Sequence, residues 1–141
     1  MLGYPVNLIH DPETQAVMVE FPDIPFAHSV GDDAADALLN AGDALESALE
    51  IYLEENRAVP LPSMAMPGQA MVRLPVLLAA KVLLWNEMQA QGIGKAELAL
   101  RLGAEFPDVE QLLELRNGSK IEHVEAALAR LGKYLDIGLA A

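Results

Sequence analysis

Cysteine is absent from this 141-residue chain, and both long apolar runs and basic residues are scarce. Without cysteine the chain forms no disulfide, has no thiolate nucleophile and offers no cysteine ligands to zinc. No apolar run reaches the roughly 18 residues that span a bilayer. The opening MLGYPVNLIHD also lacks the basic region and the apolar core of a signal peptide. We therefore expect a cytoplasmic protein that does not bind membranes.

The scarcity of basic residues is concentrated in the first half of the chain. Residues 1–67 hold 12 acidic residues and one basic residue, Arg57, for a net charge of −11. Residues 68–141 hold 9 acidic and 8 basic residues, for a net charge of −1. An acidic field repels nucleic acid and speeds encounter with a basic partner. We therefore expect the first half to bind a basic protein.

Hydrophobic residues make up 52% of the chain, which is ample for a core, and their spacing changes along the sequence. Two runs alternate on either side of a turn at residues 11–14. In the first, Tyr4, Val6 and Leu8 alternate with Pro5, Asn7 and Ile9, and in the second, Val17, Val19 and Phe21 resume the alternation. This alternation predicts a β-hairpin. A third short strand is expected at residues 27–30, and residues 71–74 are expected to return to the same sheet.

One long acidic helix is predicted between the third strand and a proline-rich linker at residues 57–70. Its apolar residues recur at three- and four-residue steps, so they form one stripe that packs on a flat partner. They are Ala34, Leu38, Ala41, Leu45, Ala48 and Tyr52. Gly31 supplies a turn before the N-terminal cap, and Pro60 ends the element. The acidic residues on the other faces are either a solvated surface or a contact surface for a basic partner.

The second half is predicted to be helical after Pro75, with helices at residues 76–88, 95–102, 108–115 and 120–131. Within it, Ala99, Gly103 and Val109 have the spacing of a helix-turn-helix. The small Ala99 lets two helices cross closely, Gly103 permits the turn, and Val109 anchors the second helix to the core.

DNA binding by this motif is a separate hypothesis. Donors on and around the second helix could contact base edges and phosphates. These candidate DNA-binding residues are Lys95, Gln111, Arg116, Asn117 and Lys120. Acidic residues on the same helix would face the phosphates and weaken a complex. They are Glu105, Asp108, Glu110 and Glu114.

Several runs of residues, taken together, resemble the HicB family of antitoxins in its helix-turn-helix branch. In the first half they are Tyr4-Pro5-Val6, Phe21-Pro22-Asp23-Ile24-Pro25, Gly31-Asp32, Ala37, Ala44-Leu45 and Val59-Pro60-Leu61-Pro62-Ser63. In the second half they are Leu74-Pro75, Ala79-Ala80-Lys81-Val82-Leu83-Leu84, the helix-turn-helix pattern and Lys120-Ile121. The resemblance implies an α+β chain. A partial ribonuclease H-like domain at residues 1–67, which the 71–74 strand rejoins, precedes an all-α helix-turn-helix domain at residues 75–141.

The resemblance also implies the partners: a small basic mRNA-cleaving toxin of the HicA type, operator DNA of the toxin–antitoxin operon, and further copies of the chain in a homodimer or higher oligomer. Five residues are candidates for toxin binding, four of them for their charge and position. They are Asp23, Phe26, Asp32, Asp33 and Asp36. Phe26 stands where many members of the family carry a small residue.

Two alternatives come from other classes of protein. A stand-alone transcriptional regulator with a ligand-sensing first domain would bind DNA without any protein partner. A ribonuclease H-like hydrolase would need several carboxylates converging on two metal ions, with one acid inside a central strand. The first predicted strand holds no acid between Tyr4 and His10, and the three histidines lack metal-ligand spacing. We therefore expect no catalytic activity, no metal and no cofactor.

Overall fold

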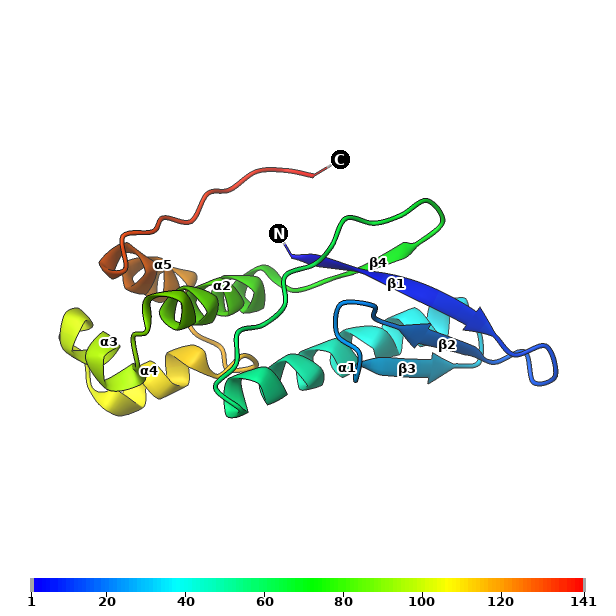
Figure 1. The fold of residues 1–141 in the computed structure, drawn as a ribbon, viewed down its shortest axis with the longest axis horizontal. Coiled ribbons are helices and arrows are strands. Elements are labelled where there is room, and N and C mark those ends of the chain that lie inside the picture. The colour runs from blue at the N-terminus through cyan, green and yellow to red at the C-terminus, as the bar shows by residue number, and fades with distance from the viewer. Residues whose placement is uncertain (1, 141) are drawn as a thin grey trace. The chain divides into compact units, whose positions relative to one another are not determined.

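The alternating residues at the start of the chain form strands, as their period of two predicts. The computed structural model describes residues 2–140, and its strands make one antiparallel sheet in the order β3-β2-β1-β4 (Figure 1). The strands are β1 (Gly3–His10), β2 (Val17–Glu20), β3 (His28–Gly31) and β4 (Ala70–Arg73). β4 lies along β1 with Tyr4 opposite Val72, so the expected return strand at residues 71–74 does pair with the hairpin.

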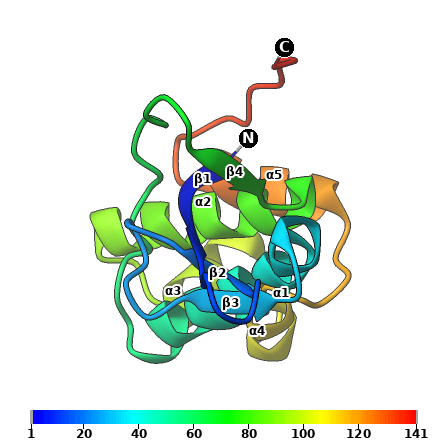
Figure 2. The same cartoon turned by 90° about the vertical axis from the view of Figure 1, so that its right-hand side faces the viewer.

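The long helix α1 (Ala34–Glu54) packs along the sheet beside β2 and β3, as both Figure 1 and Figure 2 show. Small residues allow this close approach. A Cβ on Gly31 would lie 2.3 Å from the Ala37 backbone nitrogen, and the Ser29 hydroxyl donates to the Ala37 carbonyl at 2.8 Å. The buried residues of α1 are Ala37, Ala41, Leu45, Ala48, Leu49 and Tyr52.

The described residues divide after Pro75 into two compact units. The first unit holds the sheet, α1 and the proline-rich linker. It therefore extends past residue 67, because β4 belongs to the same sheet as β1. The whole chain is α+β, which confirms the predicted fold class.

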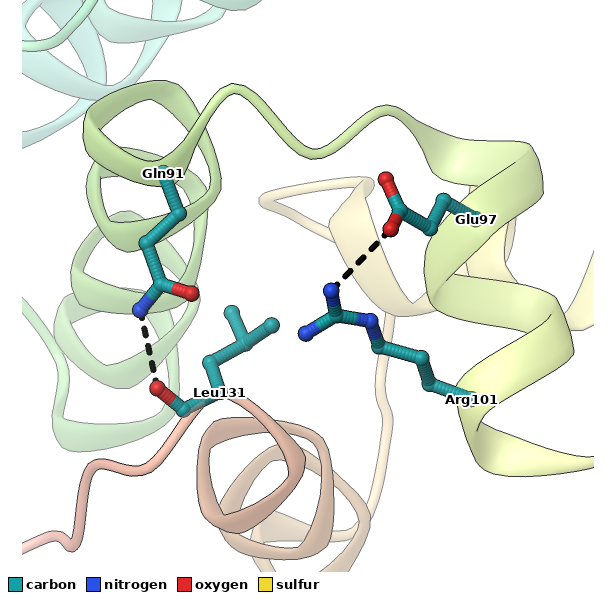
Figure 3. A network of polar contacts seen from close by, with 4 residues as sticks. All are labelled: Gln91, Glu97, Arg101 and Leu131. Carbon is teal, nitrogen blue, oxygen red and sulfur yellow. Dashed lines mark hydrogen bonds and ion pairs between the residues drawn. The ribbon is translucent and has the colours of Figure 1, made fainter.

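The second unit contains only helices and connecting segments between residues 76 and 140. Its helices are α2 (Val76–Gln91), α3 (Lys95–Leu102), α4 (Phe106–Leu113) and α5 (Ile121–Arg130). Gln91 at the end of α2 donates to the Leu131 carbonyl at 2.8 Å, and Arg101 pairs with Glu97 along α3 (Figure 3). The core side chains of this unit include Val82, Trp85, Met88, Leu98, Val109 and Val124.

The segment expected to form a helix-turn-helix contains α3, a short turn and α4. Gly103 has a left-handed backbone with φ of 63°, and its N–H caps the end of α3. Ala99 and Val109 are both buried. α4 begins at Phe106 rather than at residue 108, because Glu105 and Asp108 form a capping box around its first turn.

Candidate functional site

Three of the candidate toxin-binding residues lie together at the N-terminal end of α1. The Asp33 side chain accepts from the Asp36 N–H at 2.8 Å, and the Asp36 carboxylate accepts from the Asp32 N–H at 2.9 Å. Carboxylates at this end also interact favourably with the positive end of the helix dipole. Asp33 and Asp36 therefore cap the helix, while the exposed Asp32 contributes its backbone to this arrangement.

The fourth candidate, Asp23, is bonded to the linker. Its carboxylate Oδ2 accepts from both the backbone N–H of Ser63 at 2.9 Å and the Ser63 hydroxyl at 3.0 Å. Nearby, the Tyr4 hydroxyl donates to the Pro60 carbonyl at 2.6 Å. Burial, together with the negative charge of Asp23, raises the pKa of the Tyr4 hydroxyl far above its usual value. Asp23 and Tyr4 thus hold the linker against the rest of the first unit.

The fifth candidate, Phe26, belongs to an aromatic cluster beside the linker. Its ring stacks on Tyr52 with 5.1 Å between ring centroids, and the Arg57 guanidinium lies 4.9 Å from the Tyr52 centroid. Phe26 keeps 41% of its surface exposed. This half-covered ring offers a flat apolar contact surface next to a cation.

Apart from Asp23, which is bonded to the linker, the candidate toxin-binding residues fall into two groups rather than one. Asp32, Asp33 and Asp36 lie at the start of α1, whereas Phe26 stacks on Tyr52 near its end. The 16 residue steps from Asp36 to Tyr52 correspond to roughly 24 Å along a helix. A partner that contacts both groups must extend along α1.

Two sets of exposed apolar residues accompany these groups, and sequence reasoning did not single them out. The linker carries Leu61, Met64 and Met66, of which Met64 is 91% exposed. On the sheet face opposite α1, the exposed side chains of Ile9, Met18 and Val30 are direct cross-strand neighbours. The period of two signals Met18, which lies between the buried Val17 and Val19.

In the second unit, most of the candidate DNA-binding residues gather around the end of α4. Gln111 is exposed on α4 and lies 3.5 Å from Asn117, whose amide nitrogen donates to the Glu114 carboxylate at 2.9 Å. Gln111 and Lys120 line the same open pocket of about 490 Å³, together with residues of α4 and α5. Arg116 is exposed on the intervening loop.

Lys95 stands apart from this group, because it is the first residue of α3 and does not line the pocket. Three of the four acidic residues on and beside α4 make local hydrogen bonds. In the capping box, the Glu105 carboxylate accepts from the Asp108 N–H, and the Asp108 carboxylate accepts from the Glu105 N–H. The Glu114 carboxylate accepts from the Asn117 side-chain amide. These local hydrogen bonds account for Glu105, Asp108 and Glu114.

Between residues 2 and 140, no helix is long and apolar enough to cross a membrane. The same residues contain no group of three or more histidine or acidic side chains placed to hold a metal ion.

Comparison with known proteins gave matches along nearly the whole chain. Residues 3–83 match the family described as "HicB_like antitoxin of bacterial toxin-antitoxin system". The chain is 41% identical over 134 residues to a protein of Pseudomonas fluorescens named "Antitoxin HicB", covering 94% of this chain and 91% of the relative. It is 42% identical to "Antitoxin HicB 2" of Photorhabdus laumondii, covering 96% and 95% of the two chains. It is 38% identical to "Antitoxin HicB" of Escherichia coli K12, covering 96% and 98%.

Proposed function

The chain belongs to the HicB-like antitoxin family, and from this premise we propose that its first unit binds and neutralises a small basic mRNA-cleaving toxin of the HicA type. The main support is the charge of that unit. Residues 1–75 carry 12 acidic residues against Arg57 and Arg73, a net charge of −10. A ribonuclease presents a positive surface to RNA, so an acidic cover finds that surface quickly and competes with the substrate.

The contact surface in this proposal runs along the acidic side of α1, from its capped start to the Phe26 cluster and the linker. The start of α1 supplies charge through Asp32, Asp33 and Asp36. The other end supplies an exposed aromatic ring and the exposed methionines of the linker, which adapt their shape to a partner. The charged end of this surface would attract a basic toxin from a distance, and the apolar end would then be removed from water when the two proteins make contact.

The test is association of the full chain with the purified product of the neighbouring small gene, across salt concentrations. Asp32→Lys is the informative variant, because its carboxylate is exposed and the cap of α1 uses the Asp33 and Asp36 side chains. Glu125→Lys on α5 makes the same change of charge in the second unit and is the matched control.

We expect Asp32→Lys to slow association about threefold to tenfold at low salt, with little change in dissociation, and Glu125→Lys to leave both nearly unchanged. Raising the salt concentration reduces the difference. Equal association rates for Asp32→Lys and the wild type would show that the start of α1 is not part of the interface. Failure to capture any basic partner would contradict the proposal as a whole.

The second half of the proposal is that α3 and α4 form a helix-turn-helix that binds operator DNA and so represses the operon. The left-handed Gly103 and the buried Ala99 and Val109 support the motif. Gln111 and Lys120 around one pocket support a DNA-facing surface there. Because Glu105 and Asp108 are engaged in the capping box, these two carboxylates do not require a role in recognition.

We also propose that the chain forms a homodimer in the cytoplasm, so that two copies of α4 bind the two halves of a two-fold symmetric operator. The segment after α5 supports a second copy as partner. Leu135, Ile137 and Leu139 recur with a period of two in an extended segment, and Ile137 is 88% exposed. Two such segments could pair as antiparallel strands and cover these side chains. Sedimentation velocity of the full chain tests the stoichiometry.

The alternative function is a stand-alone transcriptional regulator without a toxin partner. It shares the DNA-binding surface and differs in the first unit, whose acidic residues would then be a solvated face. Operator binding together with failure to capture a toxin would favour it. Neither function assigns a catalytic step, a metal or a cofactor to the chain.

A further inference from the structure

A lysine side chain is fully buried in the second unit, where it contacts the end of α4. Lys81 on α2 has 0% exposed surface, although a lysine ammonium is among the groups least often found inside a protein. Its Nζ donates to the Glu114 carbonyl at 2.7 Å and to the Asn117 carbonyl at 2.8 Å, and it lies 3.5 Å from the Gln111 carbonyl. The buried charge is therefore compensated by backbone oxygens.

These oxygens belong to the end of α4 and to the loop that follows it. The last carbonyl groups of a helix have no partner within the helix and carry partial negative charge. Gln111 is in the last turn of α4, Glu114 is its C-terminal cap, and Asn117 is in the loop. A single ammonium thus joins the helix end to the loop. Burial lowers the pKa of Lys81, and the negative charge of Glu114 opposes this shift.

The same short segment carries most of the proposed DNA contacts. The backbone carbonyl groups of Gln111 and Asn117 face the Lys81 ammonium. Their side chains, which are the candidate DNA contacts, lie 3.5 Å from each other. Exposed Arg116 lies between two of the bonded residues, and Lys120 begins α5. The backbone that presents these side chains is held by Lys81.

We propose that Lys81 is a positioning residue for DNA binding: its ammonium holds the end of α4 and the 114–117 loop in the arrangement that presents Gln111, Arg116 and Asn117 to DNA. This inference rests on the proposed binding of operator DNA. Lys81 itself does not touch DNA, because it is fully buried. Its removal therefore acts through the geometry of the loop, whereas removal of an exposed lysine acts through charge alone.

The first experiment measures the affinity of the full chain for operator DNA by fluorescence anisotropy, with variants that separate position, charge and stability. Lys81→Met keeps the unbranched side chain and removes the ammonium. Lys133→Met removes one positive charge from an exposed position in the same unit. Leu128→Ala opens the core at α5 without changing charge, and it controls for lost stability.

We expect Lys81→Met to weaken DNA binding about tenfold or more, because three carbonyl groups lose their charged donor and the loop is released. At a temperature where circular dichroism shows every variant folded, Lys133→Met and Leu128→Ala should bind within about twofold of the wild type. Toxin capture by the first unit should be the same for all of them. Equal DNA affinity of Lys81→Met and the wild type would overturn the inference.

The second experiment uses the wild-type chain, so it does not depend on the folding of a variant. NMR couplings across hydrogen bonds from the Lys81 ammonium nitrogen to the carbonyl carbons of Glu114 and Asn117 are expected, with slow exchange of the ammonium protons. A rapidly exchanging ammonium without such couplings would overturn the inference even if Lys81→Met binds DNA poorly. If the wild type binds no operator DNA while the couplings are present, the proposed DNA binding fails and the positioning role falls with it.

Discussion

At the scale of single residues, polar side chains in the first unit hold backbone segments in place. Tyr4, Asp23 and Asp33 each bind a backbone group: the Pro60 carbonyl, the Ser63 N–H and the Asp36 N–H. Two of these bonds attach the proline-rich linker to the unit, and the third starts α1. A polar residue chosen from the sequence as a binding candidate can therefore already be occupied, as Asp23 is.

Tyr4→Phe tests the attachment of the linker. The variant keeps the ring and removes the hydroxyl that donates to Pro60, so we expect a loss of about 1 kcal/mol in the free energy of unfolding at pH 7. Urea denaturation followed through NMR signals of the first unit measures this loss. Tyr134→Phe, which changes an exposed tyrosine outside that unit, should have no effect.

The pH dependence of stability gives a second readout for Tyr4. An unfolded tyrosine ionises near pH 10, whereas burial raises the pKa of folded Tyr4 well above that value. The contribution of Tyr4 is thus fully present below about pH 10 and is lost as the pH rises above it, because unfolding then releases a proton. Tyr4→Phe should lack this loss. An identical decline in both proteins above pH 10 would contradict the assignment.

At the scale of elements, the contact between β3 and α1 decides which small residues are required. A Cβ added to Gly31 would lie 2.3 Å from the Ala37 backbone nitrogen. A Cβ added to Gly42, within α1, would have no neighbouring atom within 4 Å. One glycine is required for packing between elements, and the other is open to substitution.

Gly31→Ala and Gly42→Ala should therefore change stability in opposite directions. We expect Gly31→Ala to destabilise the first unit by about 1–3 kcal/mol, because the added methyl group displaces the first turn of α1. Gly42→Ala should stabilise it by about 0.5–1 kcal/mol, because alanine favours a helix interior over glycine. Urea denaturation of the two variants measures both signs. Destabilisation by Gly42→Ala would show that α1 is crowded at that position.

At the scale of the whole molecule, charge is divided between the two units. The first unit has a net charge of −10, while residues 76–141, with 9 acidic and 7 basic residues, have a net charge of −2. The lower repulsion of DNA by the second unit fits the proposed division of binding between the two.

This division predicts that the two activities can be removed separately. Lys120→Ala should weaken operator binding and lower the dependence of affinity on salt by about one counterion, with toxin binding unchanged. Asp32→Lys should do the reverse, slowing toxin association and sparing DNA. Anisotropy titrations at several salt concentrations, with Lys133→Ala as the control, measure the first effect. A Lys120→Ala variant that loses toxin binding would show that the two activities share a site.

Much of the architecture follows from local spacing in the sequence. The period of two predicts the hairpin, the three- and four-residue steps predict α1, and the spacing of Gly103 predicts where α3 ends. These elements were predictable because hydrogen bonding, capping and the exclusion of proline act over a few residues. The acidic first half and the family resemblance are likewise properties of the sequence alone.

The distant contacts were decided only by the tertiary structure. Val76 and Leu83 are apolar residues of α2, yet they are 52% and 36% exposed, while Lys81 is buried on the same helix. Because α2 is apolar on nearly every side, its spacing does not indicate which face is covered. Likewise, spacing cannot show that Asp23 binds Ser63, 40 residues away, or that three carbonyls converge on Lys81. Such contacts join segments far apart in the chain, so only the packing of whole elements determines them.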